Sequence, residues 1–367
     1  MKKKTEYLIT VVTMAVLIFG LSLWAVLKPV DEYSESERRP LDDFPEVTWN
    51  SVLKGNFMTD FEGYTLDQFP LRDTFRRIKA LAQFYIFGIS ESNGLYVEDG
   101  QIGKLDFPLN EGSVNYAADR FTDLYNTYMD GKVNSVVFSI VPDKGYYIGE
   151  ENGYPVMDYD RLAEIMENRL DFADYCDITS FLDKTDYYNT DTHWKQQELG
   201  GAADAILGML NARPFDDLKE ETATDKFYGV YYGQLGFPLP AEDIKYLVNE
   251  ELLSMSVMNY ETGKTTGVYD FDKLTSRDPY EFYLSGAASL LEVTNPNAEG
   301  DRHLIIFRDS FGSSIAPLLM RDYAKITLID TRYIVPSMLG EFVDFEGADV
   351  LFIYSSLILN DSYVIRK

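Results

Sequence analysis

The sequence is poor in cysteine and histidine, two side chains that often build reactive sites. It has one cysteine, Cys176, so no disulfide can form within the chain and stability must come from a packed core. Cys176 lies among alternating apolar and polar residues, which is typical of a small buried side chain rather than a nucleophile. Only two histidines occur, His193 and His303, so the search for a general base is short.

Other patterns are also missing. No repeat with a period of roughly twenty to fifty residues occurs, which argues against a solenoid or propeller. The chain has no glycine-rich phosphate loop and no cluster of histidines, cysteines and carboxylates at metal-ligand spacing, so the sequence predicts no cofactor and no metal. A length of 367 residues fits one large catalytic domain, or a domain that contains an inserted subdomain.

Positive charge is scarce outside the N-terminus. Residues 1–30 carry four lysines and Glu6, a net charge of +3, so the rest of the chain carries −30 against −27 for the whole. Such a surface repels phosphate backbones and anionic lipid headgroups, which argues against a nucleic-acid partner. The charge does not identify a substrate, because solubility alone also accounts for it.

The N-terminus predicts a membrane anchor. Three lysines precede an uncharged apolar run of 20 residues, Leu8–Leu27, which is long enough to cross a bilayer core of roughly 30 Å as a helix. The lysines place the N-terminal side in the cytoplasm and everything after Lys28 outside. A cleaved signal peptide is the alternative, but its apolar core would span about 7–15 residues and end at small residues. We therefore expect residues 1–28 to be a cytoplasmic tip and an uncleaved transmembrane helix.

After a linker at 29–56, apolar periodicity predicts alternating helices and strands. Helices are expected over two pieces of 57–87 divided at Pro70, and over 111–130, 158–172, 195–211 and Gly312–Met320. Strands are expected over 94–97, Val133–Val141, Cys176–Phe181, His303–Phe307, Lys325–Ile329 and Asp349–Tyr354.

This alternation predicts an α/β fold with a doubly wound parallel sheet, whose chemistry would lie beyond the carboxyl ends of the strands. Residues 214–300 interrupt the alternation, since they are rich in tyrosine, glycine and turn signals. We expect an inserted, mainly β subdomain or excursion there, between a first part of the domain at 57–213 and a second part at 301–367.

Of the two histidines, only His193 suits a serine that follows a strand. Ser310 comes after the strand that His303 precedes, so seven residues at roughly 3.3 Å each separate them by up to about 23 Å. Asp191 and His193 are two residues apart and in extended chain project to the same side, so the carboxylate can hold one imidazole nitrogen and leave the other to take a proton. The alternative is a helix cap beside a structural histidine.

Ser310 lies on a predicted strand-to-helix turn. Such a turn exposes the hydroxyl beside backbone N–H groups that can stabilise an oxyanion, and Gly312 lets the backbone approach closely. The alternative is an ordinary helix-capping serine. The Asp-Ser-Phe-Gly run is weak evidence alone and stronger when combined with the Asp-Thr-His-Trp run.

Five short runs are shared with a known family. They are Phe69–Asp73, Val141–Lys144, Tyr188–Trp194, Asp309–Gly312 and Ile329–Tyr333. On these runs the chain resembles the DHHW proteins and, more distantly, the SGNH-hydrolase-like alginate O-acetyltransferases of the bacterial periplasm. The resemblance implies an SGNH-like fold from about residue 57 to the C-terminus and a catalytic triad of Asp191, His193 and Ser310. Two residues depart from the patterns, since Thr192 replaces the second histidine of the DHHW run and Arg308 replaces an SGNH glycine.

Further residues near the strand ends are candidates for contact with a substrate or an oxyanion. Trp194 can wall an acyl pocket, stack on a sugar or belong to the core, and Arg332 and Tyr333 can line the same cleft or form a solvated turn. Asn360 can donate a hydrogen bond to an oxyanion. The complete candidate set is Gly312, Trp194, Tyr188, Arg332, Tyr333, Lys144, Arg308 and Asn360.

These observations predict an extracytoplasmic, single-pass serine acyl-transfer enzyme. The resemblance to the alginate enzymes and the anchor favour an O-acetyltransferase that acts on a cell-surface polysaccharide through an acetyl-Ser310 intermediate. With water as acceptor the same triad is a carbohydrate acetylesterase, and the sequence does not choose between them. A non-catalytic glycan-binding or envelope scaffold protein, with tyrosines as stacking platforms, is the hypothesis from another class. The resemblance alone implies an acetyl donor supplied by an integral membrane acyltransferase.

Overall fold

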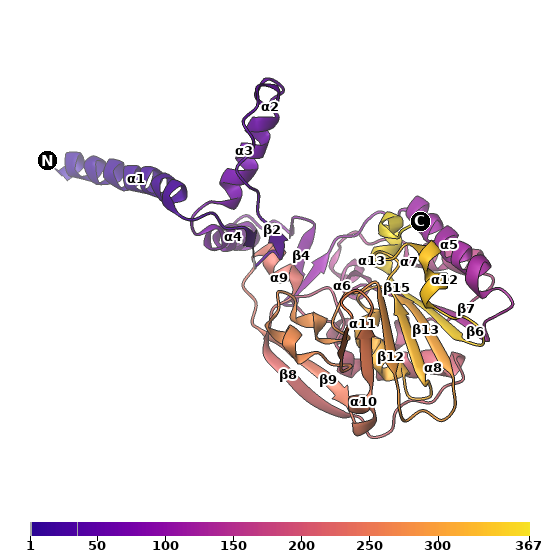
Figure 1. Cartoon of the computed structure of the whole chain (residues 1–367). Coiled ribbons are helices and arrows are strands. Elements are labelled where there is room, and N and C mark those ends of the chain that lie inside the picture. The colour runs from indigo at the N-terminus through magenta and orange to yellow at the C-terminus, as the bar shows by residue number, and fades with distance from the viewer. Residues whose placement is uncertain (1, 35) are drawn as a thin grey trace. The chain divides into compact units, whose positions relative to one another are not determined.

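The computed structural model describes residues 2–34 and 36–367, which form two compact units. The N-terminal unit ends at Asn93 and takes in Tyr232–Pro238, and the C-terminal unit holds the remaining residues. Figure 1 follows the chain through both units. The three residues of the predicted triad all belong to the C-terminal unit.

The N-terminal unit is mainly helical. Its elements are α1 (Lys2–Leu27), β1 (Tyr33–Ser34), β2 (Arg39–Pro40), α2 (Trp49–Leu53), α3 (Asn56–Asp67), α4 (Arg72–Leu81), a π-helix (Ala82–Ile86) and β3 (Glu91–Ser92). Within α1, Lys3–Leu27 is long and apolar enough to cross a membrane, and none of its most apolar stretch is buried inside the protein. The predicted N-terminal apolar helix is therefore confirmed.

Ion pairs order part of the predicted linker at 29–56. Arg39 lies 2.6 Å from Asp67 at the end of α3, and Glu37 lies 2.5 Å from Arg72 and 3.2 Å from Arg76 in α4. Because these contacts are ionic, they leave no periodic pattern of apolar residues in the sequence, and this part is therefore typical of a linker.

A sheet of eight strands forms the centre of the C-terminal unit, in the order β11-β10-β12-β14-β13-β15-β6-β7. The pairs from β14 to β7 are parallel, and those from β11 to β14 are antiparallel. The parallel strands are β14 (Lys325–Ile329), β13 (His303–Arg308), β15 (Asp349–Ser355), β6 (Ser135–Val141) and β7 (Asp174–Tyr175). The four longer ones are runs of almost wholly buried residues, as expected for strands covered on both faces.

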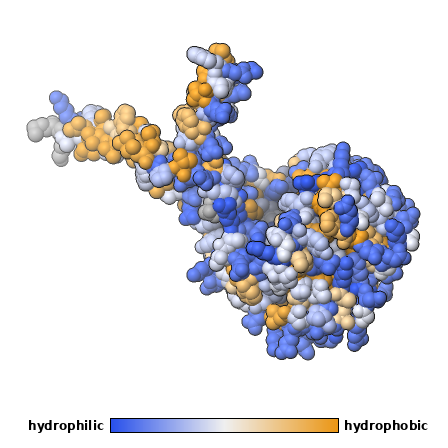
Figure 2. Space-filling view, in the orientation of Figure 1, coloured by the Kyte–Doolittle hydropathy of each residue, from blue (hydrophilic) through white to orange (hydrophobic). Residues whose placement is uncertain are grey.

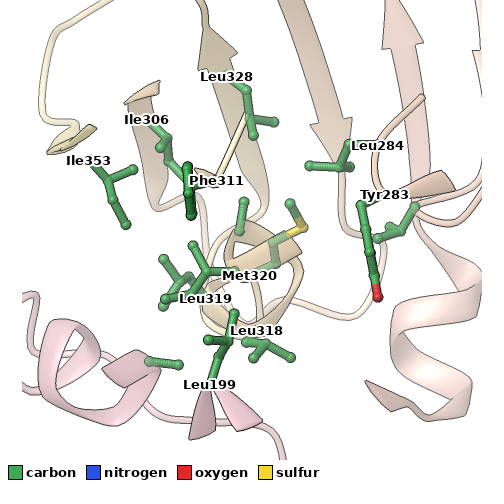
Figure 3. Close-up of a cluster of buried hydrophobic side chains, with 14 of the residues drawn as sticks. Leu199, Tyr283, Leu284, Ile306, Phe311, Leu318, Leu319, Met320, Leu328 and Ile353 are labelled. Carbon is green, nitrogen blue, oxygen red and sulfur yellow. The ribbon is translucent and has the colours of Figure 1, made fainter. Parts of the chain in front are cut away.

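Apolar layers cover both faces of this sheet. Ile306 and Ile353 point into one layer, which includes helix α8 (Gly200–Met209) and is shown in part in Figure 3. Phe307 and Phe352 point into the other layer, with α5 (Glu111–Leu124) and α7 (Tyr159–Arg169). The predicted doubly wound α/β architecture is confirmed, with a mostly parallel sheet.

Residues 214–300 divide between two structures. β8 (Lys219–Phe227) and β9 (Glu242–Val248) form an antiparallel pair of their own. β10 (Ser256–Asn259), β11 (Lys264–Thr266) and β12 (Leu290–Thr294) extend the central sheet instead. The buried side chains of β10 and β12 join the same apolar layer as β13, which explains why this part of the predicted excursion belongs to the core.

Several predicted elements are shorter in the structure. The helix predicted at Gly312–Met320 is α11 (Gly312–Ile315) followed by a 3-10 turn (Ala316–Leu319) that contains Pro317, which cannot donate a helical hydrogen bond. The helix predicted to begin at Lys195 begins at Gly200, after a 3-10 turn. The strand predicted over Cys176–Phe181 is replaced by the two-residue β7 directly before it and by a 3-10 turn at Thr179–Phe181.

Candidate active site

The turn after β13 carries Ser310, and Asp309 fastens it. The Asp309 carboxylate accepts hydrogen bonds from the Phe311 N–H at 3.0 Å, the Ser355 N–H at 2.8 Å and the Ser355 hydroxyl at 2.6 Å. Because Ser355 is the last residue of β15, Asp309 ties together the carboxyl ends of two neighbouring parallel strands. Ser310 itself is half-buried.

His193 lies against Ser310, although 117 residues separate the two in the sequence. Its Nε2 is 2.8 Å from Ser310 Oγ, and its Nδ1 is 2.5 Å from Asp191 Oδ1. An ionised Asp191 accepts only, so the fitting tautomer carries its proton on Nδ1 and leaves Nε2 to accept from the serine hydroxyl. The structure therefore brings together the three residues that the sequence singled out.

Asp191 and the imidazole are both held from further sides. Asp191 Oδ2 accepts from the Val230 N–H at 2.7 Å, and Oδ1 also accepts from the His193 backbone N–H at 3.0 Å. The ring of Tyr280 stacks on the His193 ring with centroids 3.9 Å apart and planes 8° from parallel. The Tyr280 hydroxyl donates to Ser314 Oγ at 2.7 Å, which keeps the stacked ring in place.

Lys144 holds the backbone of the loop that leads to Asp191. Its Nζ donates to the carbonyls of Ile102 at 2.8 Å, Tyr188 at 2.6 Å and Asp191 at 3.0 Å. Burial lowers the pKa of Lys144 to about 7, against the opposing effect of nearby carboxylates such as Glu242. The sequence suggested that Lys144 contacts substrate, but the side chain is 2% exposed and faces the loop instead.

Glu242, on β9, binds the backbone N–H groups of the same loop. Its carboxylate accepts from the Asn189 N–H at 2.7 Å, the Thr190 N–H at 2.9 Å and the Thr190 hydroxyl at 2.7 Å. Lys144 and Glu242 thus bind the carbonyls and the amides of one loop respectively. We call these two residues the loop clamp.

Trp194 and Tyr188 are fully buried, so neither offers a face to a sugar. Trp194 Nε1 donates to Ser314 Oγ at 2.8 Å and to the Phe311 carbonyl at 3.2 Å. The Tyr188 ring packs edge-on against Phe227. Both belong to the core behind the site, which was one of the alternatives for Trp194.

Arg308, which replaces the SGNH glycine, lies in the interior. Its guanidinium donates to Ser313 Oγ at 2.9 Å and to the Gly286 carbonyl at 3.1 Å. A Cβ at Gly312 would lie 2.5 Å from the Arg308 Cβ, so the turn needs glycine at that position. Arg308 therefore supports the Ser310 turn from the protein interior and does not line a substrate surface.

Three further candidates bond elsewhere. Arg332 pairs with Asp330 at 2.7 Å, and the neighbouring Tyr333 is half exposed. The Asn360 carboxamide accepts from the Asn110 N–H at 2.6 Å and donates to Asp106 at 3.1 Å. Among the described residues, none of the three has a hydrogen bond to Ser310 or His193, although the Arg332 guanidinium lies near enough to Asp309 to interact with its charge.

His303 lies at the amino end of β13, the opposite end from Ser310. Its Nε2 lies 2.8 Å from Thr327 Oγ1, and burial beside Lys325 lowers its pKa to about 4. A histidine that is neutral at ordinary pH and bonded to a neighbouring strand is a structural residue.

Sequence reasoning missed Tyr280, Glu242 and the Val230 N–H. Tyr280 is one of 27 tyrosines and Glu242 one of 60 acidic residues, and both come from the region at 214–300 that carried no motif. A backbone N–H leaves no trace in the residue type. No local signal could have found these groups.

The fold has known counterparts. No protein-family model matches the chain, and no curated protein matches it at the significance required. A DHHW family protein from Eubacterium siraeum is similar in structure, with 19% identity and a TM-score of 0.58 over 76% of this chain and 98% of that one. PatB1 from Bacillus cereus, solved with a sulfonyl adduct, has 16% identity and a TM-score of 0.57 over 74% and 98%. At the level of fold, the resemblance seen in the sequence is confirmed.

Proposed function

We propose that this protein is a serine acyl-transfer enzyme in which Ser310 is the nucleophile, His193 the general acid and base, and Asp191 the group that orients the imidazole. The supporting observation is the 2.8 Å contact between Ser310 Oγ and His193 Nε2, with Asp191 2.5 Å from the other ring nitrogen. A base within hydrogen-bond reach of the nucleophile, itself oriented by a third group, is the arrangement that activates a serine.

The proposed reaction has two steps. His193 Nε2 takes the Ser310 hydroxyl proton while Oγ attacks the carbonyl carbon of an acetyl donor, and the protonated ring then gives that proton to the leaving group. Acetyl-Ser310 remains. In the second step His193 deprotonates a sugar hydroxyl, whose oxygen attacks the acetyl-enzyme, and Ser310 regains its proton. Asp191 stabilises the imidazolium in both steps.

The negative oxygen that develops in each step needs a donor. The Ser310 backbone N–H donates to no described residue, and the turn is held rigid by Asp309 and Gly312. A preorganised N–H beside the nucleophile is suited to an oxyanion. We assign the Ser310 N–H to this role.

The proposed acyl group is acetyl and the proposed acceptor is a hydroxyl of a cell-surface polysaccharide. The resemblance of the Tyr188–Trp194 and Asp309–Gly312 runs to alginate O-acetyltransferases supports both choices. PatB1, which shares this fold, was solved with a sulfonyl adduct. Sulfonyl reagents react with activated nucleophiles, so they provide a direct test here.

The proposed location is outside the cytoplasm, with α1 as a single-pass anchor. The span Lys3–Leu27 has the required length and hydropathy, and the lysines before it favour a cytoplasmic N-terminus. An integral membrane acyltransferase is the proposed source of the acetyl donor.

Phenylmethylsulfonyl fluoride and p-nitrophenyl acetate test the proposal on the purified full chain. We expect one sulfonyl group on Ser310 by mass spectrometry, an acetyl group on the same residue after a short exposure to the ester, and neither in Ser310→Ala. A wild-type chain that takes up no acyl or sulfonyl group at Ser310 would support the non-catalytic scaffold instead. Addition of an oligosaccharide acceptor separates transferase from esterase, since a transferase moves acetyl to sugar and an esterase releases acetate regardless.

A further inference from the structure

Helix α4 packs in the N-terminal unit with its polar face toward the rest of that unit. Arg72 and Arg76 lie on one side of the helix and pair with Glu37, at 2.5 Å and 3.2 Å, and Arg72 also lies 3.3 Å from Asp67. These four side chains are all less than about one-fifth exposed, so ionic contacts fasten the helix to the unit. A helix of a water-soluble domain normally buries its apolar stripe and exposes its charges.

The apolar side of α4 and its continuation is exposed. Side chains three or four positions apart form one stripe along the helix, because a turn takes 3.6 residues. Its members are between 43% and 75% exposed, and we call them the outer face: Leu71, Phe75, Ile78, Tyr85 and Ile86. Phe75 also contacts Phe69, and Tyr85 contacts Phe237, but the stripe remains exposed, although the same side chains would be buried in an ordinary globular helix.

The end of the proposed anchor is bonded to the chain just before α4. Lys28, which follows α1, donates to Gln68 Oε1 at 3.2 Å, and Gln68 exchanges two further hydrogen bonds with the Asp31 backbone, at 2.8 Å and 2.9 Å. Trp24, in the last turn of α1, lines the same pocket as Leu71. Within this unit, the outer face therefore begins at the outer end of the proposed membrane span.

The charges beside the outer face fit lipid headgroups. Helix α4 contains four basic residues and one acidic residue in a chain that is otherwise strongly acidic. Arg77 and Lys79 are exposed and form no ion pair with a described residue. An amphipathic helix with apolar residues on one side and flanking cations is the type that lies in the plane of a membrane interface. Figure 2 shows apolar surface on α1 and also on α2 and α3 of the same unit.

We propose that the outer face of α4 is embedded in the outer surface of the lipid bilayer, beside the anchor. The proposal rests on the proposed anchor and deepens it: α1 crosses the membrane, and α4 lies along it. Together they attach the N-terminal unit at two points, so that it does not turn freely about a single span. If the apolar side of α4 faces the lipid, its ionic side has to face the protein, which is the orientation that the structure shows.

Fluorescent labels in nanodiscs of phosphatidylcholine and phosphatidylglycerol test this proposal on the full chain. The single native thiol, Cys176, is buried, and burial raises its pKa to about 11, so an NBD label goes to an introduced cysteine. We expect the label on Ile78→Cys to be quenched by doxyl-lipid and shielded from iodide. The matched control, Asp73→Cys, lies on the opposite side of the same helix and should be quenched by iodide.

A third label, on Leu17→Cys in the middle of α1, separates this proposal from the anchor. If Leu17 is quenched by lipid while both α4 positions are quenched by iodide, the anchor stands and the embedded outer face is wrong, which leaves a protein partner as its occupant. If Leu17 is also quenched by iodide, α1 does not span the bilayer and both ideas fail. The proposal is supported only if the labels at Leu17 and Ile78 are quenched by lipid and the label at Asp73 is not.

Discussion

The two units place their side chains in opposite ways. The N-terminal unit exposes apolar residues such as Ile78 and pairs its arginines inside, whereas the C-terminal unit buries Lys144, Arg308 and Asp309 around a serine. Each arrangement carries a cost in water, since exposed apolar area and buried charge are both unfavourable. In the C-terminal unit, hydrogen bonds inside the protein offset the cost. In the N-terminal unit, the proposed compensation comes from the lipid bilayer.

This difference shows how to distinguish a buried polar group that serves a site from one that serves only the fold. In the C-terminal unit, the buried charges of Lys144 and Asp309 hold one loop and one turn. That loop and turn carry Asp191, His193 and Ser310. The four predictions that follow test this contrast, beginning with the change that should remove the most activity.

Replacing Ser310 by Ala should lower esterase turnover at least about 10³-fold, because His193 Nε2 loses the hydroxyl that it contacts. The free energy of unfolding should change by less than about 1 kcal/mol, since Ser310 is half-buried and, among the described residues, its hydroxyl has His193 as its single hydrogen-bond partner. Turnover of p-nitrophenyl acetate and urea denaturation measure the two effects. Retained turnover would show that Ser310 is not the nucleophile of the C-terminal unit.

Replacing Lys144 by Met should destabilise the C-terminal unit by about 2–4 kcal/mol, because the buried carbonyls that it binds lose their hydrogen-bond donor. A lysine whose pKa falls to about 7 on folding binds fewer protons folded than unfolded between pH 7 and its unfolded value of 10.5. The stability of the wild type should therefore rise with pH across that window, by at most about 1.4 kcal/mol per unit, relative to the variant.

Urea denaturation at several pH values measures this difference, with Lys184→Met as the control. Lys184 forms an exposed pair with Asp99, so its removal should cost less than about 1 kcal/mol. Equal effects of the two substitutions would mean that the loop clamp does not hold the site.

Replacing Tyr280 by Leu should lower kcat/KM by about tenfold, because the imidazole loses the ring on which it is stacked. Tyr280→Phe keeps the ring and loses only the bond to Ser314, so its kcat/KM should fall by less than about threefold. Steady-state kinetics of the pair separate a role in holding His193 from general packing. A Phe variant as slow as the Leu variant would assign the effect to the hydroxyl network instead.

Replacing Ile78 by Asp should change the free energy of unfolding in detergent-free solution by less than about 0.5 kcal/mol, because the side chain is already exposed. The matched change Ile306→Asp, in the buried strand β13, should prevent folding. Circular dichroism melts compare the two. A large loss at Ile78 would show that the outer face packs against the protein.

The sequence was sufficient for the central strands because β6, β13, β14 and β15 are nearly continuous buried runs. It also singled out Ser310 and the Asp191–His193 pair, which the structure places in hydrogen-bond contact, while their catalytic role stays a prediction. Tyr280 and Glu242 could not be found, because they reach the site only through the packing of β9 and the chain before β12. Helical periodicity likewise predicted α4 but not which of its faces turns outward, since an amphipathic pattern is the same in either orientation.

The distance of 117 residues between the two halves of the site has a consequence for how the protein matures. Ser310 contacts His193 only in the folded C-terminal unit, where β13 pairs with β15 and β15 with β6. The Tyr280 ring then stacks on the His193 ring. Under the proposed function, a chain whose last strands are not yet folded lacks the contact between Ser310 and His193 and therefore has no acyl-transfer activity.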